Sequence, residues 1–166
     1  MTTDISAPAA IVLPEEAEVL GDDSSSIRLL TDASATGGAV SSLEVRMAAG
    51  VDGASPHFHT RSSELFYVID GELQVLADDK IMTVGAGGSL VVPKRMIHAF
   101  GAAPGAPARV LIALTPGVER FDYFRLLGRI RDGEATADDL MASQDRFDNH
   151  FVGAPNWWAE REAGRR

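Results

Sequence analysis

From residue 26 to residue 116 the chain is a series of short, strand-like runs, several of them rich in β-branched and aliphatic residues. These runs cover residues 26–31, 40–47, 57–59, 64–69, 72–77, 80–84, 90–92, 97–100 and 109–114. Turn-forming residues such as Asp78-Asp79 separate them. Short strands at regular spacing, with turn signals between them, predict an antiparallel β-sandwich or barrel. Asp70-Gly71, between two such runs, predicts a tight hairpin at that point.

After residue 116 the apolar residues recur at helical spacing. The residues that share this spacing are Phe121, Phe124, Leu127 and Ile130, and they predict an amphipathic helix. A second helix is expected to begin at Thr136, which with Asp139 resembles a capping box, and to run to about residue 149. The pair Trp157-Trp158 is expected to pack the C-terminal tail onto the domain or a partner subunit. A lid over the barrel mouth is the alternative.

Length and composition indicate one turn-rich domain. The chain has 166 residues, and its 16 glycines and 8 prolines favour turns over a helical bundle. The net charge is −9, and residues 1–26 carry six acidic residues and no basic one. We therefore expect an acidic, solvated N-terminal arm over residues 1–25, a β-barrel over 26–116, and C-terminal helices with a tail packed on the barrel over 117–166.

Charge and cysteine content exclude several classes of protein. The chain has no basic stripe that could neutralise phosphates, which argues against a nucleic-acid partner. It has no cysteine, so disulfides, zinc–thiolate sites and cysteine nucleophiles are excluded, and a cytoplasmic location is expected. Residues 1–20 lack the basic start and apolar core of a signal peptide. No later apolar run is long enough to span a bilayer, so we expect no membrane partner.

Three of the four histidines lie in the β region, and two of them form a His-x-His pair. Because His57 and His59 are two residues apart in an extended run, both side chains can project to one face, toward a barrel interior. Glu64 heads the next run, on an otherwise apolar strand face. A buried carboxylate requires a partner, and a metal ion shared with the histidines would provide one. The alternative is a solvated histidine pair at a strand end, and the spacing alone leaves the part played by His98 open.

Two linked motifs resemble the signatures of the cupin superfamily. The first is formed by His57, His59, Glu64 and Gly71, and the second by Gly87, Pro93 and His98. The resemblance covers residues 40–115. The layout is also similar to that of single-domain bacterial cupins grouped with the quercetin 2,3-dioxygenases. In those proteins the barrel is followed by Pro-Gly, an aromatic-rich helix and a terminal helix near a Val-Gly-x-Pro, as at Pro116-Gly117 and residues 152–155 here.

This resemblance implies a small antiparallel jelly-roll barrel with a C-terminal helical appendage, commonly a homodimer. It also implies a site for one divalent transition metal, with His57, His59, Glu64 and His98 as ligands. Iron, manganese, nickel, copper and zinc all suit such a donor set. Arg95 stands where the family has a glycine, and it is interpreted either as a solvated turn residue or as an anion or dimer contact.

The first functional hypothesis is a metal-dependent oxygenase that acts on a small aromatic or enolisable substrate. Glu64 would be a ligand and a general base, and Phe66, Val68 and Phe100 would line the substrate pocket. The second hypothesis is a non-redox cupin enzyme, a polyketide cyclase or isomerase, that uses the metal as a Lewis acid. The third is a cupin that binds a small molecule without converting it, since the fold alone does not decide function.

Overall fold

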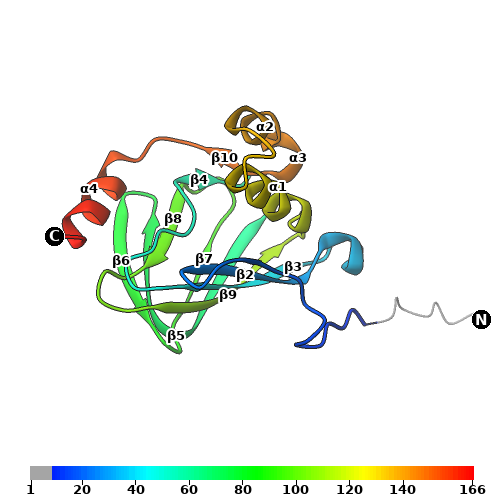
Figure 1. Ribbon diagram of the computed structural model, residues 1–166, viewed down its shortest axis with the longest axis horizontal. Helices are drawn as coiled ribbons and strands as arrows, with labels where there is room; N and C mark the ends of the chain where they lie inside the picture. The colour runs from blue at the N-terminus through cyan, green and yellow to red at the C-terminus, as the bar shows by residue number, and fades with distance from the viewer. Residues whose placement is uncertain (1–8) are drawn as a thin grey trace, which may run out of the picture.

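Antiparallel strands form the larger part of the regular secondary structure in the computed structural model, which describes residues 9–166 (Figure 1). The strands are β1 (Val19–Gly21), β2 (Ser25–Thr31), β3 (Ser41–Met47), β4 (His57–Phe58), β5 (Ser63–Ala77), β6 (Lys80–Gly85), β7 (Ser89–Val92), β8 (His98–Ala102), β9 (Ala108–Thr115) and β10 (His150–Phe151). The helices are the 3-10 helix η1 (Ala33–Thr36), α1 (Phe121–Arg131), α2 (Ala137–Ala142), α3 (Gln144–Phe147) and α4 (Pro155–Gly164). The predicted architecture, mainly β with helices near the C-terminus, is confirmed.

The long strand β5 belongs to both halves of the sheet. Its first half pairs with β7 and β9, and its second half pairs with β6 and β8. The pairing order through the molecule is β1-β2-β3-β9-β5-β8-β4-β10, and every pair is antiparallel. Within residues 9–166, hydrogen bonds do not close this order into a complete barrel. Because β5 turns from one half into the other, the two halves enclose a common interior.

The interior is filled by alternate residues of β3, β5 and β9. Successive side chains of a strand point to opposite faces, and in β9 every second residue is buried. The buried apolar residues of these three strands include Leu43, Val45, Phe66, Val68, Val110, Ile112 and Leu114. Burial of each such side chain stabilises the fold by roughly 1.5–3 kcal/mol.

The prediction of a hairpin at Asp70-Gly71 is wrong, because β5 continues through this pair without a reversal of direction. Opposite β9 the register shifts between Val68 and Asp70, which bends the strand. Gly71 has a φ of +74°, and a Cβ atom there would lie 1.8 Å from the carbonyl oxygen of Pro107. Glycine is therefore required for a close backbone approach at the bend. The hairpin that joins β5 to β6 lies at Asp78, whose φ is +58°.

The first predicted helix is confirmed as α1, but the second is interrupted. Thr136 and Asp139 form the expected capping box at the start of α2. The helix ends at Ser143, whose hydroxyl donates to the carbonyl of Leu140 at 2.7 Å. Such a side-chain bond satisfies the terminal carbonyl and competes with continuation of the helix. The separate helix α3 follows and ends at Asp148, which adopts a left-handed conformation with a φ of +52°.

Segments near both ends of the described chain contact the sheet. Residues 1–25 were expected to form a solvated arm; residues 1–8 lie outside the described part, and Val19–Gly21 pairs with β2. At the other end, α4 packs on the side of β8 and β6 (Figure 1). Trp157 is fully buried there against Leu76 and Ala99, whereas Trp158 is 41% exposed. None of the helices within residues 9–166 is long and apolar enough to cross a membrane.

A buried arginine fixes α4 to the sheet. Arg161 is 2% exposed, and its guanidinium donates to Asp52 Oδ1 at 2.8 Å and Gln74 Oε1 at 2.9 Å. It also donates to the carbonyls of Ala102 and Gly50, at 2.7 and 2.8 Å. Every nitrogen of this guanidinium has a partner, so the charge is compensated despite its burial.

We predict that Arg161→Met lowers the free energy of unfolding by about 3 kcal/mol, because Gln74 Oε1 and the carbonyls of Ala102 and Gly50 lose their donor. Urea denaturation followed by circular dichroism measures this change. The control is Arg166→Met near the exposed end of the chain, where a surface pair with Glu162 is lost, and a change within about 0.5 kcal/mol is expected. Equal effects of the two variants would contradict the assigned role of Arg161.

Candidate metal centre

Three strands bring the predicted site residues together. His57 starts β4 and pairs directly with His98 at the start of β8. His59 follows β4 immediately, and Glu64 lies near the start of β5. All four side chains point inward, with exposures of 1% to 5%. The alternative of a solvated histidine pair is therefore wrong, because the two-residue spacing places both rings in the interior.

The ligand atoms of these four residues converge. One potential ligand atom from each residue lies within 4.8 Å of those of the other three. Glu64 Oε2 is 2.7 Å from His98 Nε2 and 3.1 Å from His59 Nε2. The rings of His57 and His98 are 4.2 Å apart between centroids. Three imidazoles around one carboxylate could hold a divalent metal ion.

Backbone carbonyls orient all three imidazoles. His57 Nδ1 lies 2.7 Å from the carbonyl oxygen of Ser55, and His98 Nδ1 lies 3.0 Å from that of Met96. His59 Nδ1 lies 2.5 Å from the carbonyl oxygen of Asp148. A carbonyl can only accept, so each Nδ1 carries the proton and donates. Nε2 is then the ring atom left for the cluster. In His59 and His98 it donates to Glu64 while it carries a proton, and it can bind a metal ion once that proton is lost.

Burial and mutual charge set the protonation of the cluster. Burial lowers the pKa of His57 well below its usual range, and the neighbouring rings of His98 and His59 lower it further. Burial acts to raise the pKa of Glu64, but hydrogen bonds from His59 and His98 outweigh it and hold that pKa well below the usual range. The carboxylate is thus ionised at neutral pH and His57 is neutral, which are the forms that bind metal.

An apolar cavity of about 220 Å³ adjoins the cluster. His57 and Glu64 contribute to its wall, and so does Phe100, one of the three predicted pocket residues. The other two, Phe66 and Val68, are fully buried in the core. Phe66 packs edge-on against the rings of both His98 and Phe100, at centroid distances of 6.3 and 5.3 Å. It therefore supports the site from behind the wall.

The C-terminal segment contributes much of the cavity, which sequence reasoning missed. Its lining residues are Arg120, Tyr123, Phe124, Leu127, Leu140, Asn149 and Phe151. They come from α1, α2 and the segment around β10, which cover one end of the strands (Figure 1). The helical spacing of Phe124 and Leu127 was recognised as an amphipathic stripe, but the pattern could not show that this stripe faces a cavity.

Two polar residues of this segment, Arg120 and Asn149, are each only 3% exposed. Arg120 Nη2 lies 3.4 Å from Asn149 Oδ1, and the guanidinium lies over the ring of Tyr123, 4.8 Å from its centroid. Burial lowers the pKa of Arg120 from its ordinary value, but an arginine stays charged at neutral pH. Burial raises the pKa of Tyr123 to about 12, so the phenol keeps its proton.

Asp148 is another residue whose role the sequence did not predict. Its carboxylate is 1% exposed and accepts from the backbone N–H and hydroxyl of Thr60, at 2.8 and 2.6 Å, and from the N–H of Arg61, at 2.8 Å. Its own carbonyl accepts from His59. Burial acts to raise the pKa of Asp148, but these hydrogen bonds from Thr60 and Arg61 outweigh it and lower the pKa. Asp148 thus connects the end of α3 to the residues around the end of β4 in two ways, through its carboxylate and through its backbone carbonyl.

Three further polar residues lie outside the cavity. Arg61 donates to carbonyls of α3 at Asp145 and Arg146, and it is more than half exposed. His150 lies in β10, where its ring stacks on Phe58 at 5.2 Å. Arg95 is exposed, with a φ of +71°, the left-handed conformation for which glycine is the usual residue.

Comparison with known proteins agrees with this architecture. Residues 43–114 match the family model of the cupin domain. A search of curated proteins found no match to the chain. Among solved structures, KdgF from Halomonas sp. is 18% identical with a TM-score of 0.57, and the match covers 69% of this chain and 98% of that one.

Two other solved structures differ in their named activities. The hydroxypropylphosphonic acid epoxidase from S. wedmorenis is 26% identical with a TM-score of 0.53, covering 64% of this chain and 59% of that one. The polyketide cyclase RemF from Streptomyces resistomycificus is 18% identical with a TM-score of 0.53, covering 69% and 91%. The stretch that matches the cupin domain, residues 43–114, includes all four clustered residues, and the chain shares its fold with these solved structures.

Proposed function

We propose that this chain is a metal-dependent cupin enzyme whose metal ligands are His57, His59, Glu64 and His98. The observation that carries the proposal is the convergence of these four groups, with each imidazole fixed through Nδ1, at the wall of an apolar cavity. The donor set suits one divalent transition metal, whether iron, manganese, nickel, copper or zinc.

The reaction that we infer is oxygenation of a small aromatic or enolisable substrate, as in the quercetin 2,3-dioxygenase-like cupins that the motifs resemble. A bound transition metal would supply redox or Lewis-acid chemistry to an oxygen-bearing substrate. Phe100, Phe124 and Leu127 line the cavity and would exclude water and pack against an apolar ring. Phe66 would hold Phe100 and His98 in position through its edge-on contacts.

Glu64 has two roles in this proposal. Its carboxylate would be a metal ligand, and Oε2 would accept a proton from an enolisable substrate as a general base. The hydrogen bonds from His59 and His98 keep it ionised, which is the form that accepts a proton, but the low pKa makes it a weak base that suits only a readily enolised substrate. Its position at the cavity wall places it within reach of a bound molecule.

A non-redox cyclase or isomerase is the second candidate, and Tyr123 favours it. The phenol lines the cavity and keeps its proton, so it can donate to a carbonyl or enolate oxygen without any change of oxidation state. Full activity with zinc and without oxygen would identify this reaction. A third candidate is a binding protein, for which ligand binding would persist in His98→Ala with no product formed.

The first prediction concerns the metal. We expect elemental analysis of the purified protein to find about one transition metal ion per chain, because one set of four donors is present. The double variant His57→Ala/His59→Ala removes half of the donors and should lose the metal. His150→Ala is the matched control, since it removes a nearby imidazole that lies outside the cluster, and it should keep the metal. Equal metal contents in the double variant and the wild type would refute the assigned ligands.

Oxygen uptake tests the proposed reaction in the same preparations. The protein loaded with iron, manganese, nickel or copper should consume oxygen with a flavonol, a diketone or a catechol, and the metal-free double variant should not. A metal-loaded protein that consumes no oxygen with any of these would exclude the oxygenase. Product formation under anaerobic conditions would instead establish the cyclase or isomerase.

We also propose that the chain forms a homodimer, through the outward face of β5, β7 and β9. Side chains of β5 that alternate with the core residues point outward, so Leu65 and Tyr67 are 37% and 43% exposed. Val91 of β7 lies opposite Leu65 and is 61% exposed. Adjacent exposed apolar residues on a flat sheet face are typical of protein interfaces.

Light scattering coupled to size-exclusion chromatography tests the dimer. The wild type should elute at twice the chain mass, and Tyr67→Glu should shift the protein to monomer because it buries a charge in the interface. Met82→Glu is the control, since it introduces the same charge at an exposed apolar residue of β6. A wild-type monomer, or a dimer that survives Tyr67→Glu, would rule out this interface.

The last prediction of this section concerns Asp148. Replacement by alanine removes three hydrogen bonds to residues next to His59, and it should lower the free energy of unfolding by about 2–3 kcal/mol. Alanine keeps the backbone carbonyl that accepts from His59 but loses the side-chain contacts that position this carbonyl, so metal affinity should fall about 10- to 100-fold. The matched control Asp145→Ala, at a fully exposed side chain, should change neither. Unchanged metal affinity in Asp148→Ala, measured by competition with a chelator, would show that Asp148 does not orient the site.

A further inference from the structure

We propose that the cavity binds a small apolar molecule through a carboxylate group, which Arg120 and Asn149 hold. This inference rests on the proposed function, because it names the class of substrate for the same site. It starts from two buried donors. Arg120 Nη1 and Asn149 Nδ2 have no hydrogen-bond partner in the described structure, although both side chains are 97% buried and line the cavity.

The two unpaired donors belong to one pair of side chains. Asn149 Oδ1 is the atom that faces the guanidinium, 3.4 Å from Nη2, so the asparagine amide presents Nδ2 as a free donor. A buried donor without an acceptor costs free energy, and natural structures leave few such groups. Two adjacent unpaired donors match the two oxygens of a carboxylate.

Arg161 is a buried arginine with a structural role, and its hydrogen-bond partners can be compared with those of Arg120. Its guanidinium is as deeply buried as that of Arg120, yet it has an acidic partner, Asp52, and an acceptor for each nitrogen. Arg120 has no ion pair within residues 9–166. The contrast indicates that the partner of Arg120 is a ligand that enters the cavity.

The charges around the cavity point to the same ligand. Among the lining residues of the described chain, Glu64 is the only carboxylate, and it is engaged with His59 and His98. If Glu64 binds a divalent cation, its charge is compensated there and Arg120 faces the cavity with an uncompensated positive charge. An incoming carboxylate restores the balance, and a bidentate pair with arginine also fixes its orientation.

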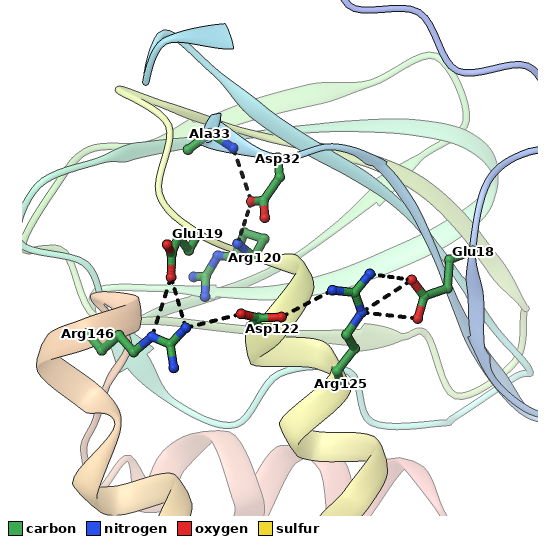
Figure 2. Close-up of polar contacts among 8 residues, drawn as sticks. All are labelled: Glu18, Asp32, Ala33, Glu119, Arg120, Asp122, Arg125 and Arg146. Carbon is green, nitrogen blue, oxygen red and sulfur yellow. Dashed lines mark hydrogen bonds and ion pairs between the residues drawn. The ribbon is translucent and has the colours of Figure 1, made fainter. Parts of the chain in front are cut away.

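The fold fixes the position of Arg120 from outside the cavity. Its backbone N–H donates to Asp32 Oδ1 at 2.8 Å, and the same oxygen accepts from Ala33 (Figure 2). One turn further along α1, Arg125 binds Asp122 and Glu18, and Asp122 also binds Arg146 of α3 (Figure 2). These contacts tie the start of α1 to the N-cap of η1, to the segment before β1 and to α3. A side chain whose backbone is anchored in this way loses less freedom when it binds an anion.

The rest of the cavity is mainly apolar, which limits the chemical group that can be attached to the carboxylate of the ligand. Ile27, Phe124, Leu127 and Leu140 are among the residues that complete the wall. With a volume of about 220 Å³, the cavity admits a single ring or a short branched chain beside the acid group. The proposed ligand is therefore a small aromatic or aliphatic monocarboxylic acid.

Calorimetric titration with benzoate and with benzamide tests the proposal. The two probes share size and ring and differ in the charged oxygen pair. The full-length protein loaded with zinc, which excludes redox chemistry, should bind benzoate about 10- to 100-fold more tightly than benzamide. In Arg120→Gln this preference should disappear, and in Arg120→Lys it should return in part, since lysine restores the charge without the bidentate geometry.

Arg129→Gln is the matched control, because it removes the same charge from an exposed position of the same helix. It should keep the wild-type preference. A purely structural role for Arg120 predicts a lower melting temperature in Arg120→Gln with an unchanged preference for benzoate, and that outcome overturns the proposal. So does equal binding of the two probes by the wild type. The expected melting temperature of zinc-loaded Arg120→Gln is equal to or above that of the wild type, because the variant removes an unpaired buried charge.

The proposal and the proposed function can fail separately. Metal content that is stoichiometric and lost in His57→Ala/His59→Ala, together with no preference for benzoate, would refute the anion site alone. A preference for benzoate that depends on Arg120, in a protein that binds no metal, would refute the metal enzyme alone. The second case is measured on metal-free wild type, where Glu64 is uncompensated and weaker benzoate binding is expected.

Discussion

The carboxylate of Asp148 accepts hydrogen bonds from two consecutive residues that follow the His-x-His pair, and its backbone carbonyl holds the second histidine of that pair. These contacts join residues that are almost ninety positions apart. They require the left-handed backbone conformation of Asp148, which ends α3 and returns the chain toward β4. From that point β10 continues along β4, with Phe151 opposite His57. The placement of α3 and β10 over the strands depends on this junction.

The C-terminal helices are therefore part of the site. The β-strands supply the four residues that could bind a metal ion, and the segment after residue 117 supplies most of the polar and aromatic groups of the cavity. The two contributions meet at the cavity wall, where Glu64 and Arg120 carry opposite charges. In cupins the strands are shared among proteins of different activity, so the added segment is a natural place for specificity to reside.

Local patterns in the sequence predicted most of the strands, α1 and the inward placement of His57, His59 and Glu64, whereas His98 joined the set only through the resemblance to the cupin motifs. His57, His59 and Glu64 could be placed on inward faces because the two-residue period of a strand fixes which side chains point together. Asp70-Gly71 misled because the same residues that favour a tight turn also permit a bend inside a continuous strand. Asp148, Arg120 and Asn149 could not be predicted, because their significance comes from contacts between distant segments, which periodicity does not record.

The passage of β5 through both halves of the sheet has a consequence for how the molecule opens. Its fifteen residues contact four other strands, and the bend at Gly71 is closed by the backbone of Pro107. Neither half can separate from its neighbours without breaking the ladder that this strand shares with the other half. We therefore expect the amides along β5 to exchange with solvent only when the entire domain unfolds.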